Sequence, residues 1–266
     1  MFKLLLLLLG VPVSGFVTDS ETGRGIRDVV VSDGYHCTVT DSTGKYFIEA
    51  DSLARTISIT VPAEYEIPLG NDAAPAFFKY IDSGETAFVL SRRKRVPERF
   101  TLVALSDAHV RDSMNVERFR KESLPDIRRT ISRHAGGGPV IGMGLGDQLW
   151  DVMDRWDVIK DGLTGFKACR KTVPFFYCIG NHDHESGAGN NEYAVTEHFV
   201  RHFGPVDYSF DIGKVHFVVM DDIQHTGTQR DGIKISYTTG LNDAQLQWLR
   251  EDLSLVRDKE HKAVVF

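Results

Sequence analysis

Three groups of side chains in the second half of the chain could bind metal ions. Asp107 and His109 stand two positions apart, Asp147 comes later, and Asn181 is followed directly by His182. Carboxylate, imidazole and amide ligands together suit manganese, iron or zinc better than calcium. One such group alone is weak evidence for a metal site. An aspartate after a strand often caps a helix, and a single histidine often only forms hydrogen bonds. The order and spacing of all three favour a metal site.

Each group follows an apolar stretch that is typical of a β-strand. These stretches are residues 100–105, 139–145 and 173–179, and a further apolar strand is expected at 263–266. The intervening and following sequence predicts helices at 116–134, 151–171, 193–203 and 242–256, and a hairpin of 207–212 with 215–221. The last helix is expected to have Asn242 or Asp243 as its cap. Alternation of strands and helices predicts an α/β domain with a largely parallel sheet, where ligands bind at the carboxyl ends of the strands.

The first part of the chain has a different pattern. Short runs of β-branched and aromatic residues at 29–31, 37–40, 46–48 and 56–61 are separated by turn formers, which predicts a small all-β sandwich over 13–92. Residues 15–19, 25–31 and 40–46 resemble the carboxypeptidase-regulatory-like β-sandwich, and this resemblance implies an accessory module. The basic run at 91–97 is interpreted as a solvated linker and not as a nuclear-localisation signal.

Composition limits the classes of function. The chain has 266 residues and a formal net charge of −6, which argues against general nucleic-acid binding because that needs a basic face. Anionic substrates stay possible, since a bound metal reverses the local field. The three cysteines are too few for a disulfide framework, and Cys178 lies in an apolar run that predicts a buried thiol.

The N-terminus predicts export. A charged start, six leucines and small residues within 1–12 are typical of a signal peptide, which would place the protein in the periplasm or outside the cell. The alternative is that the leucines begin a buried strand. No stretch of the sequence is long enough to be a transmembrane helix.

The three groups together resemble the calcineurin-like metallophosphoesterases. The resemblance rests on Asp107-Ala108-His109, Gly146-Asp147 and residues 180–183, and it covers about residues 99–266. It implies a domain over 97–266 built as a four-layer α/β/β/α sandwich with two metal ions. A β-sandwich followed by such a domain resembles the Bacteroidetes-type members of this family, which carry a further C-terminal domain.

The resemblance also implies a role for each residue. Asp107 and His109 would bind the first metal, Asp147 would bridge both metals, and Asn181 would bind the second. His182 would contact the leaving or phosphoryl oxygen, and Asp183 would orient His182.

Two features depart from the family pattern. Trp150 stands where many members carry an acid, which here comes one residue later as Asp151, and core packing of Trp150 is favoured over stacking on a substrate. The later histidine and the Gly-His-x-His motif that complete the family's metal ligands do not occur in the sequence. A chain truncated at its C-terminus and a weak second metal site are therefore expected.

These observations predict an enzyme that hydrolyses a phosphate monoester or diester with a hydroxide that bridges two metals, while His182 protonates the leaving group. The alternative is an inactive fragment or a surface-binding protein whose β-sandwich mediates the interaction. Substrate, metal identity and oligomeric state are left open. His184 could contact substrate or cap its loop, and His216 is expected to be packed in a strand.

Overall fold

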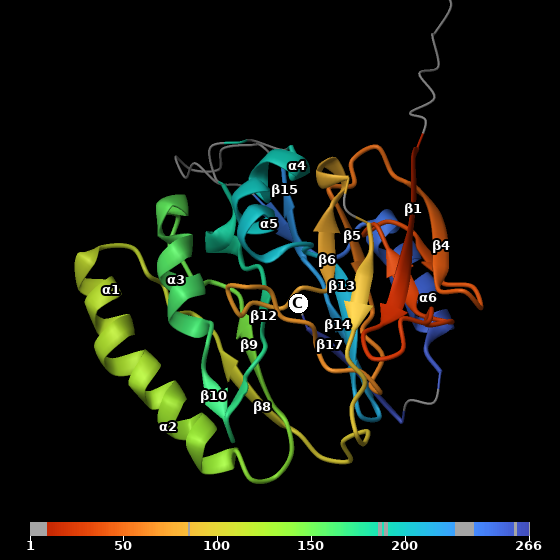
Figure 1. The fold of residues 1–266 in the computed structure, drawn as a ribbon. Helices are drawn as coiled ribbons and strands as arrows, with labels where there is room; N and C mark the ends of the chain where they lie inside the picture. The colour runs from red at the N-terminus through yellow and green to blue at the C-terminus, as the bar shows by residue number, and fades with distance from the viewer. Residues whose placement is uncertain are drawn as a thin grey trace, which may run out of the picture.

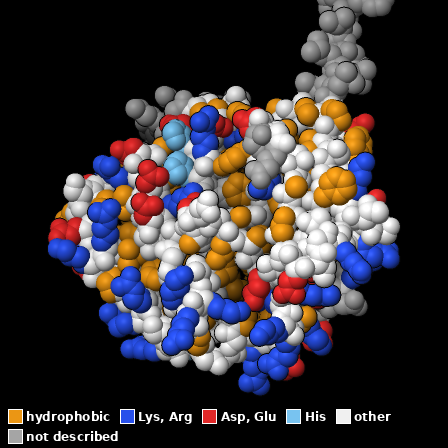
Figure 2. Space-filling view, in the orientation of Figure 1, with side chains coloured by type: hydrophobic (Ala, Val, Ile, Leu, Met, Phe, Trp, Pro, Cys, Tyr) orange, Lys and Arg blue, Asp and Glu red, His pale blue; other side chains and the backbone are white. Residues whose placement is uncertain are grey.

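The computed structural model describes residues 10–84, 86–185, 188, 191–226, 237–257 and 260–265. The chain is a mixed α/β protein with a β-rich N-terminal part (Figure 1). The expected signal peptide over 1–12 falls mostly on residues 1–9, which lie outside the described residues, whereas Val11 and Pro12 are already paired in the first strand. Charged side chains of both signs cover the visible face of the molecule (Figure 2).

Two sheets form the N-terminal part. Strand β1 (Val11–Asp19) pairs antiparallel with β4 (Lys45–Ala50) and parallel with β7 (Phe88–Leu90). A four-stranded sheet has the order β3 (Cys37–Val39), β2 (Val30–Ser32), β5 (Thr56–Ile59) and β6 (Phe78–Tyr80), which the short 3-10 helix η1 (Ile81–Ser83) follows. Alternate residues of β4 are buried, as expected for a strand with one face on the core. The four strands predicted here are present as β2 to β5, and β1, β6 and β7 are additional.

A parallel three-stranded sheet follows. Its order is β12 (Phe175–Cys178), β9 (Val140–Leu145) and β8 (Thr101–Leu105), and both pairings are parallel, as predicted. Both faces of β12 are buried: Phe175 and Tyr177 pack with the helices, while Phe176 and Cys178 enter the core shared with the N-terminal strands. The edge strand β8 leaves Leu102 and Ala104 exposed. Because the strands are parallel, their carboxyl ends lie at one edge.

The helices cover the outer face of this sheet, as Figure 1 shows for α1, α2 and α3. The helical segments are α1 (Ser113–Arg118), the π-helical η2 (Phe119–Ser123), α2 (Leu124–His134), η3 (Met153–Arg155), α3 (Trp156–Leu163), η4 (Asn181–Asp183), α4 (Glu192–Val195), α5 (Glu197–Phe203) and α6 (Asp243–Leu255). Asn242 caps α6 in a reciprocal capping box with Gln245, which resolves the choice between Asn242 and Asp243. Within the described ranges, no helix is long and apolar enough to cross a membrane.

The predicted helix over 151–171 is wrong in its second half. Helix α3 ends at Leu163, and Gly165 has a φ of 79° that no regular helix allows. A short hairpin of β10 (Lys167–Ala168) and β11 (Lys171–Thr172) then forms around Cys169 and Arg170, whose φ angles are 47° and 70°. The chain turns there through left-handed conformations that these residue types do not signal.

A second sheet lies between the parallel sheet and the N-terminal strands (Figure 1). Strands β13 (Tyr208–Ile212) and β14 (Val215–Val219) form the predicted hairpin, and β17 (His261–Val265) joins β14 in parallel. The pair β15 (Ile223–His225) and β16 (Tyr237–Thr239) was not predicted.

One hydrophobic core joins the β-rich part to the rest of the chain. The core contains Val31 and Phe77 from the N-terminal part together with Phe176, Tyr208 and others from the remainder. The Phe77 ring lies 4.8 Å from that of Tyr208 and 5.7 Å from that of Phe176. Polar contacts cross the same boundary, such as the bond from the buried Trp248 Nε1 to Ser32 Oγ at 2.8 Å.

We therefore expect Phe77→Ala to destabilise the whole chain in one transition. Loss of this buried ring should lower the free energy of unfolding by about 3–5 kcal/mol. Denaturant unfolding followed by far-UV circular dichroism and by tryptophan fluorescence should give one common, lowered midpoint. Phe47→Ala removes an exposed ring and should shift the midpoint little. Two separated transitions in either protein would show that the parts fold independently.

His216 is packed in β14, as predicted, and lies between two carboxylates. Its Nδ1 is 2.8 Å from Asp211 Oδ1 and its Nε2 is 2.7 Å from Asp252 Oδ2. A neutral imidazole has only one N–H, so only the imidazolium donates to both acids. Burial opposes the charge, but the hydrogen bonds and charges of Asp211 and Asp252 outweigh it and raise the pKa of His216 to about 9.

This pKa predicts a loss of stability at alkaline pH. A histidine with a pKa that is higher in the folded than in the unfolded chain stabilises the fold fully below pH ~6.5, and that contribution disappears as pH rises through about 9. The free-energy difference between wild type and His216→Gln should shrink by about 3 kcal/mol between pH 6 and pH 10. Urea unfolding at several pH values measures it, with the exposed His134→Gln as a control that should show no such trend. A difference that is constant with pH would contradict a charged His216.

Candidate metal centre

The loops that follow β8, β9 and β12 are bonded to one another through their backbones. After β8, the Asp107 N–H donates to Gly146 O at 3.2 Å and the His109 N–H donates to Asp147 O at 3.0 Å. These bonds hold the first two predicted groups side by side at the carboxyl edge of the sheet.

The third group is brought in by a close approach of two backbones. A Cβ atom on Gly180 would lie 2.3 Å from both the backbone N and Oδ1 of Asp147, so only glycine fits there. The His182 N–H then donates to Asp147 Oδ1 at 3.0 Å. The turn η4 is thus fixed against Asp147.

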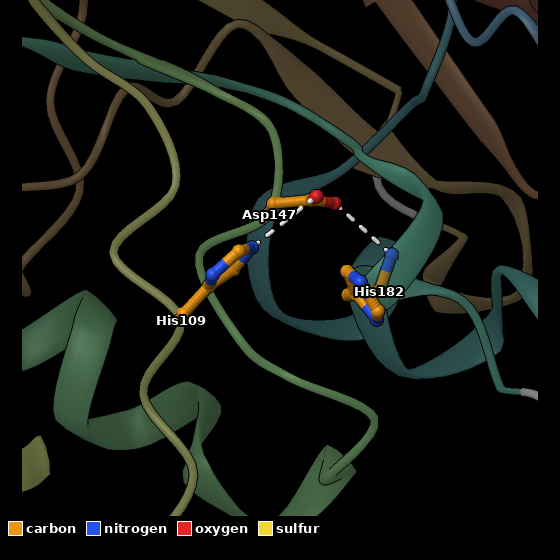
Figure 3. A group of neighbouring side chains, drawn as sticks. All are labelled: His109, Asp147 and His182. Carbon is orange, nitrogen blue, oxygen red and sulfur yellow. Dashed lines mark hydrogen bonds and ion pairs between the residues drawn. The ribbon is translucent and has the colours of Figure 1, made fainter.

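His109, Asp147 and His182 form one compact group of potential ligands. One ligand atom from each lies within 4.8 Å of the others, and the three half-buried side chains converge in Figure 3. His109 Nε2 is 3.4 Å from Asp147 Oδ2 and 3.7 Å from Asp107 Oδ1. The Asp107 side chain is 63% exposed and lies at the rim of the group.

Asn181 opens the same turn, directly before His182. Its side-chain amide has no hydrogen-bond partner within the described part of the chain. The structure therefore brings His109, Asp147 and His182 together with Asp107 at the rim, and the ligand role of Asn181 stays a proposal.

Four non-glycine residues around the group have left-handed backbone conformations. Their φ angles are 55° at Asp107, 48° at His109, 50° at Asp147 and 54° at Asp151. Such conformations cost of order 1–3 kcal/mol each and are typical of functional sites, where the surrounding structure imposes them.

Asp151 is the carboxylate that contacts the imidazole of His182. Its Oδ1 lies 3.0 Å from His182 Nδ1, and its backbone N–H donates to His182 O at 3.1 Å. Asp151 stands one position beyond the family's acid, and the sequence alone indicates no role for it.

The role expected for Asp183 is wrong. Asp183 is fully buried, and its carboxylate accepts from the backbone N–H groups of Leu149 at 2.9 Å, Gly180 at 3.1 Å and Gln148 at 3.3 Å. Burial raises its pKa to about 7, against these hydrogen bonds, which favour the charged form. Asp183 therefore holds the turns together, and Asp151 takes the place beside the His182 ring.

Core packing of Trp150 is also wrong. The side chain is 40% exposed, and its ring stacks on His182 with centroids 4.9 Å apart and an interplanar angle of 28°. It meets His109 edge-on at 4.5 Å, and the Arg111 guanidinium lies 5.8 Å from its centroid. Trp150 thus restrains the two histidines of the group.

His184 caps the loop and cannot contact substrate, because it is fully buried. Its Nδ1 lies 2.8 Å from Gly180 O and its Nε2 lies 2.9 Å from Asp221 Oδ2, so it links the metal-site turn to the end of β14. This contact supports Gly180 from the inside of the protein.

The close approach at Gly180 leads to a prediction. Gly180→Ala should push the turn away from Asp147 and weaken binding of Mn²⁺ or Zn²⁺ about 10–100-fold, as for other supports of metal ligands. Isothermal titration calorimetry measures the affinity. Gly136→Ala is the matched control, since a Cβ there meets nothing within 4 Å. If Gly180→Ala binds the metal with unchanged affinity, the position of this turn does not contribute to metal binding.

Residues 11–93 match the family model described as the N terminal of Calcineurin-like phosphoesterase. No curated protein sequence matches the chain. The match over these residues suggests a phosphoesterase family.

Proposed function

We propose that this chain is a metal-dependent phosphoesterase that hydrolyses a phosphate monoester or diester. The observation that carries the proposal is the convergence of His109, Asp147 and His182 from the ends of three parallel strands. The family suggested by residues 11–93 supports it.

The residues present fit a transition metal. The imidazole of His109 and the carboxylate of Asp147, with the Asp107 carboxylate at the rim, form a donor set suited to manganese, iron or zinc. We assign Asp107 and His109 to a first ion, Asp147 to a bridging position and Asn181 to a second ion. When bound, the ions lower the pKa of a water nucleophile and neutralise charge on the phosphoryl oxygens.

The side chains of the site perform the remaining steps. His182 holds a proton at Nε2 for the leaving-group oxygen, because its Nδ1 is engaged with Asp151. The Asp151 carboxylate fixes the ring in one orientation. Trp150 adds a second restraint by stacking on the same ring. The fixed position of the general acid His182 should increase the rate of hydrolysis, because small displacements of a catalytic group lower the rate strongly.

Two finer features belong to the same proposal. The helices, the two central sheets and the layer beyond them would form the four-layer arrangement of this enzyme class. The leucine-rich start would direct the protein to the periplasm or the outside of the cell.

His182→Ala tests the assignment of the general acid. Turnover of a chromogenic phosphate ester should fall about 10²–10⁴-fold, because proton transfer to the leaving group is lost. Metal content, measured by inductively coupled plasma mass spectrometry, should stay close to that of the wild type.

His109→Ala is the matched control and should lose metal as well as turnover. Loss of metal in His182→Ala would instead make His182 a ligand. A wild-type chain that binds no manganese, iron or zinc and hydrolyses neither ester would favour the surface-binding alternative.

A further inference from the structure

A large groove lies at the end of the parallel sheet opposite the metal group. It has a volume of about 1100 Å³, and residues at the starts of β8, β9 and β12 line it. Six cations contribute to the lining: Arg92, Arg93, Lys94, Arg95, Arg99 and Lys171. In the lower half of Figure 2, Lys and Arg side chains, together with several Asp and Glu side chains, border a hollow in which hydrophobic side chains are visible.

The groove is positively charged on a negatively charged chain. Three carboxylates, those of Glu21, Glu66 and Glu98, face the six cations, whereas the formal net charge of the whole chain is −6. Glu66 is already paired with Arg93 and with Lys171.

The unpaired cations come from the basic run that sequence analysis interpreted as a linker. Lys94, Arg95 and Arg99 are exposed, and none of them forms an ion pair with any residue that the structure describes. Arg93 is different, because its Nε donates to Tyr65 O at 2.8 Å and anchors the run to the β-rich part. The run is thus held in place as a wall of the groove, and its remaining charges point to an anionic ligand.

The apolar side chains at the floor of the groove restrict the chemical class of ligand that fits it. Apolar side chains such as Ile67, Leu69 and Val173 line it, and no aromatic residue does. Single-stranded nucleic acids bind on aromatic stacking platforms, which are absent from this lining. An acidic peptide needs no such platform: its carboxylates meet the cations and its apolar side chains meet the floor.

The size of the groove agrees with a peptide. Sites for small molecules have volumes of about 300–1,000 Å³. A groove of about 1100 Å³ lies at the upper end of this range and has room for several residues of an extended chain. We propose that this groove binds an acidic, partly apolar peptide segment of another protein.

This site is distinct from the metal group. Strand β9 has six residues between the two ends, which corresponds to a separation of about 20 Å. Peptide binding and hydrolysis can therefore be tested separately, and neither result depends on the other.

The test uses a fluorescein-labelled peptide in which glutamate alternates with leucine. Fluorescence polarisation of this peptide should show saturable binding to the full chain at physiological ionic strength. The triple variant Lys94→Gln, Arg95→Gln, Arg99→Gln should bind about tenfold more weakly or worse, because exposed charges that steer and hold an anionic partner are lost. Added salt should weaken binding to the wild type more than to the variant.

The matched control removes the same charge from a distant helical face: Arg118→Gln, Arg120→Gln, Lys121→Gln should bind like the wild type. A peptide of alternating lysine and leucine should not bind. The proposal is overturned if the acidic peptide fails to saturate, if both triple variants lose affinity equally, or if a single-stranded oligonucleotide or a sulfated polysaccharide binds more tightly than the peptide.

Discussion

The backbone contact between Gly180 and Asp147 is the constraint on which the site depends. It exists because Gly180 lacks a side chain and because the strands before both residues are adjacent and parallel. The left-handed conformations at Asp107, His109 and Asp147 are unfavourable individually, and they persist because backbone bonds between the loops leave no alternative. The buried Asp183 completes this arrangement by accepting three backbone N–H groups from the same loops.

Much of the fold around this contact could be predicted from the sequence. Apolar runs that end in polar ligands predicted three parallel strands with their carboxyl ends together, and the structure has them in the order β12-β9-β8. The hairpin at Cys169 and Arg170 could not be predicted, since neither residue type signals a positive φ. The shared core could not be predicted either: alternation along a strand shows that one face is buried, but it does not identify the element that covers it.

In the candidate site, too, some features could be predicted from the sequence and others could not. Asp107, His109, Asp147 and His182 were found because ligand chemistry depends on residue type and order. The contact of Asp151 with His182 could not be predicted and core packing of Trp150 was wrong, because the positions of both side chains depend on the turn after Asp147. The φ of 54° at Asp151 is part of a turn that brings its carboxylate to His182 and leaves Trp150 exposed over both histidines. No pattern of residue types encodes such a reversal.

Net charge proves to be a poor guide to what this chain can bind. The value of −6 is a sum over the whole chain, whereas six cations and only three carboxylates line the groove. The net charge argues against general nucleic-acid binding, yet a basic groove is present. The lining of the groove gives a stronger argument against nucleic-acid binding than the net charge does. It offers positive charge and apolar surface but no aromatic ring on which a base could stack. Arguments about partners therefore belong to individual surfaces, where charge, shape and side-chain type act together on one ligand.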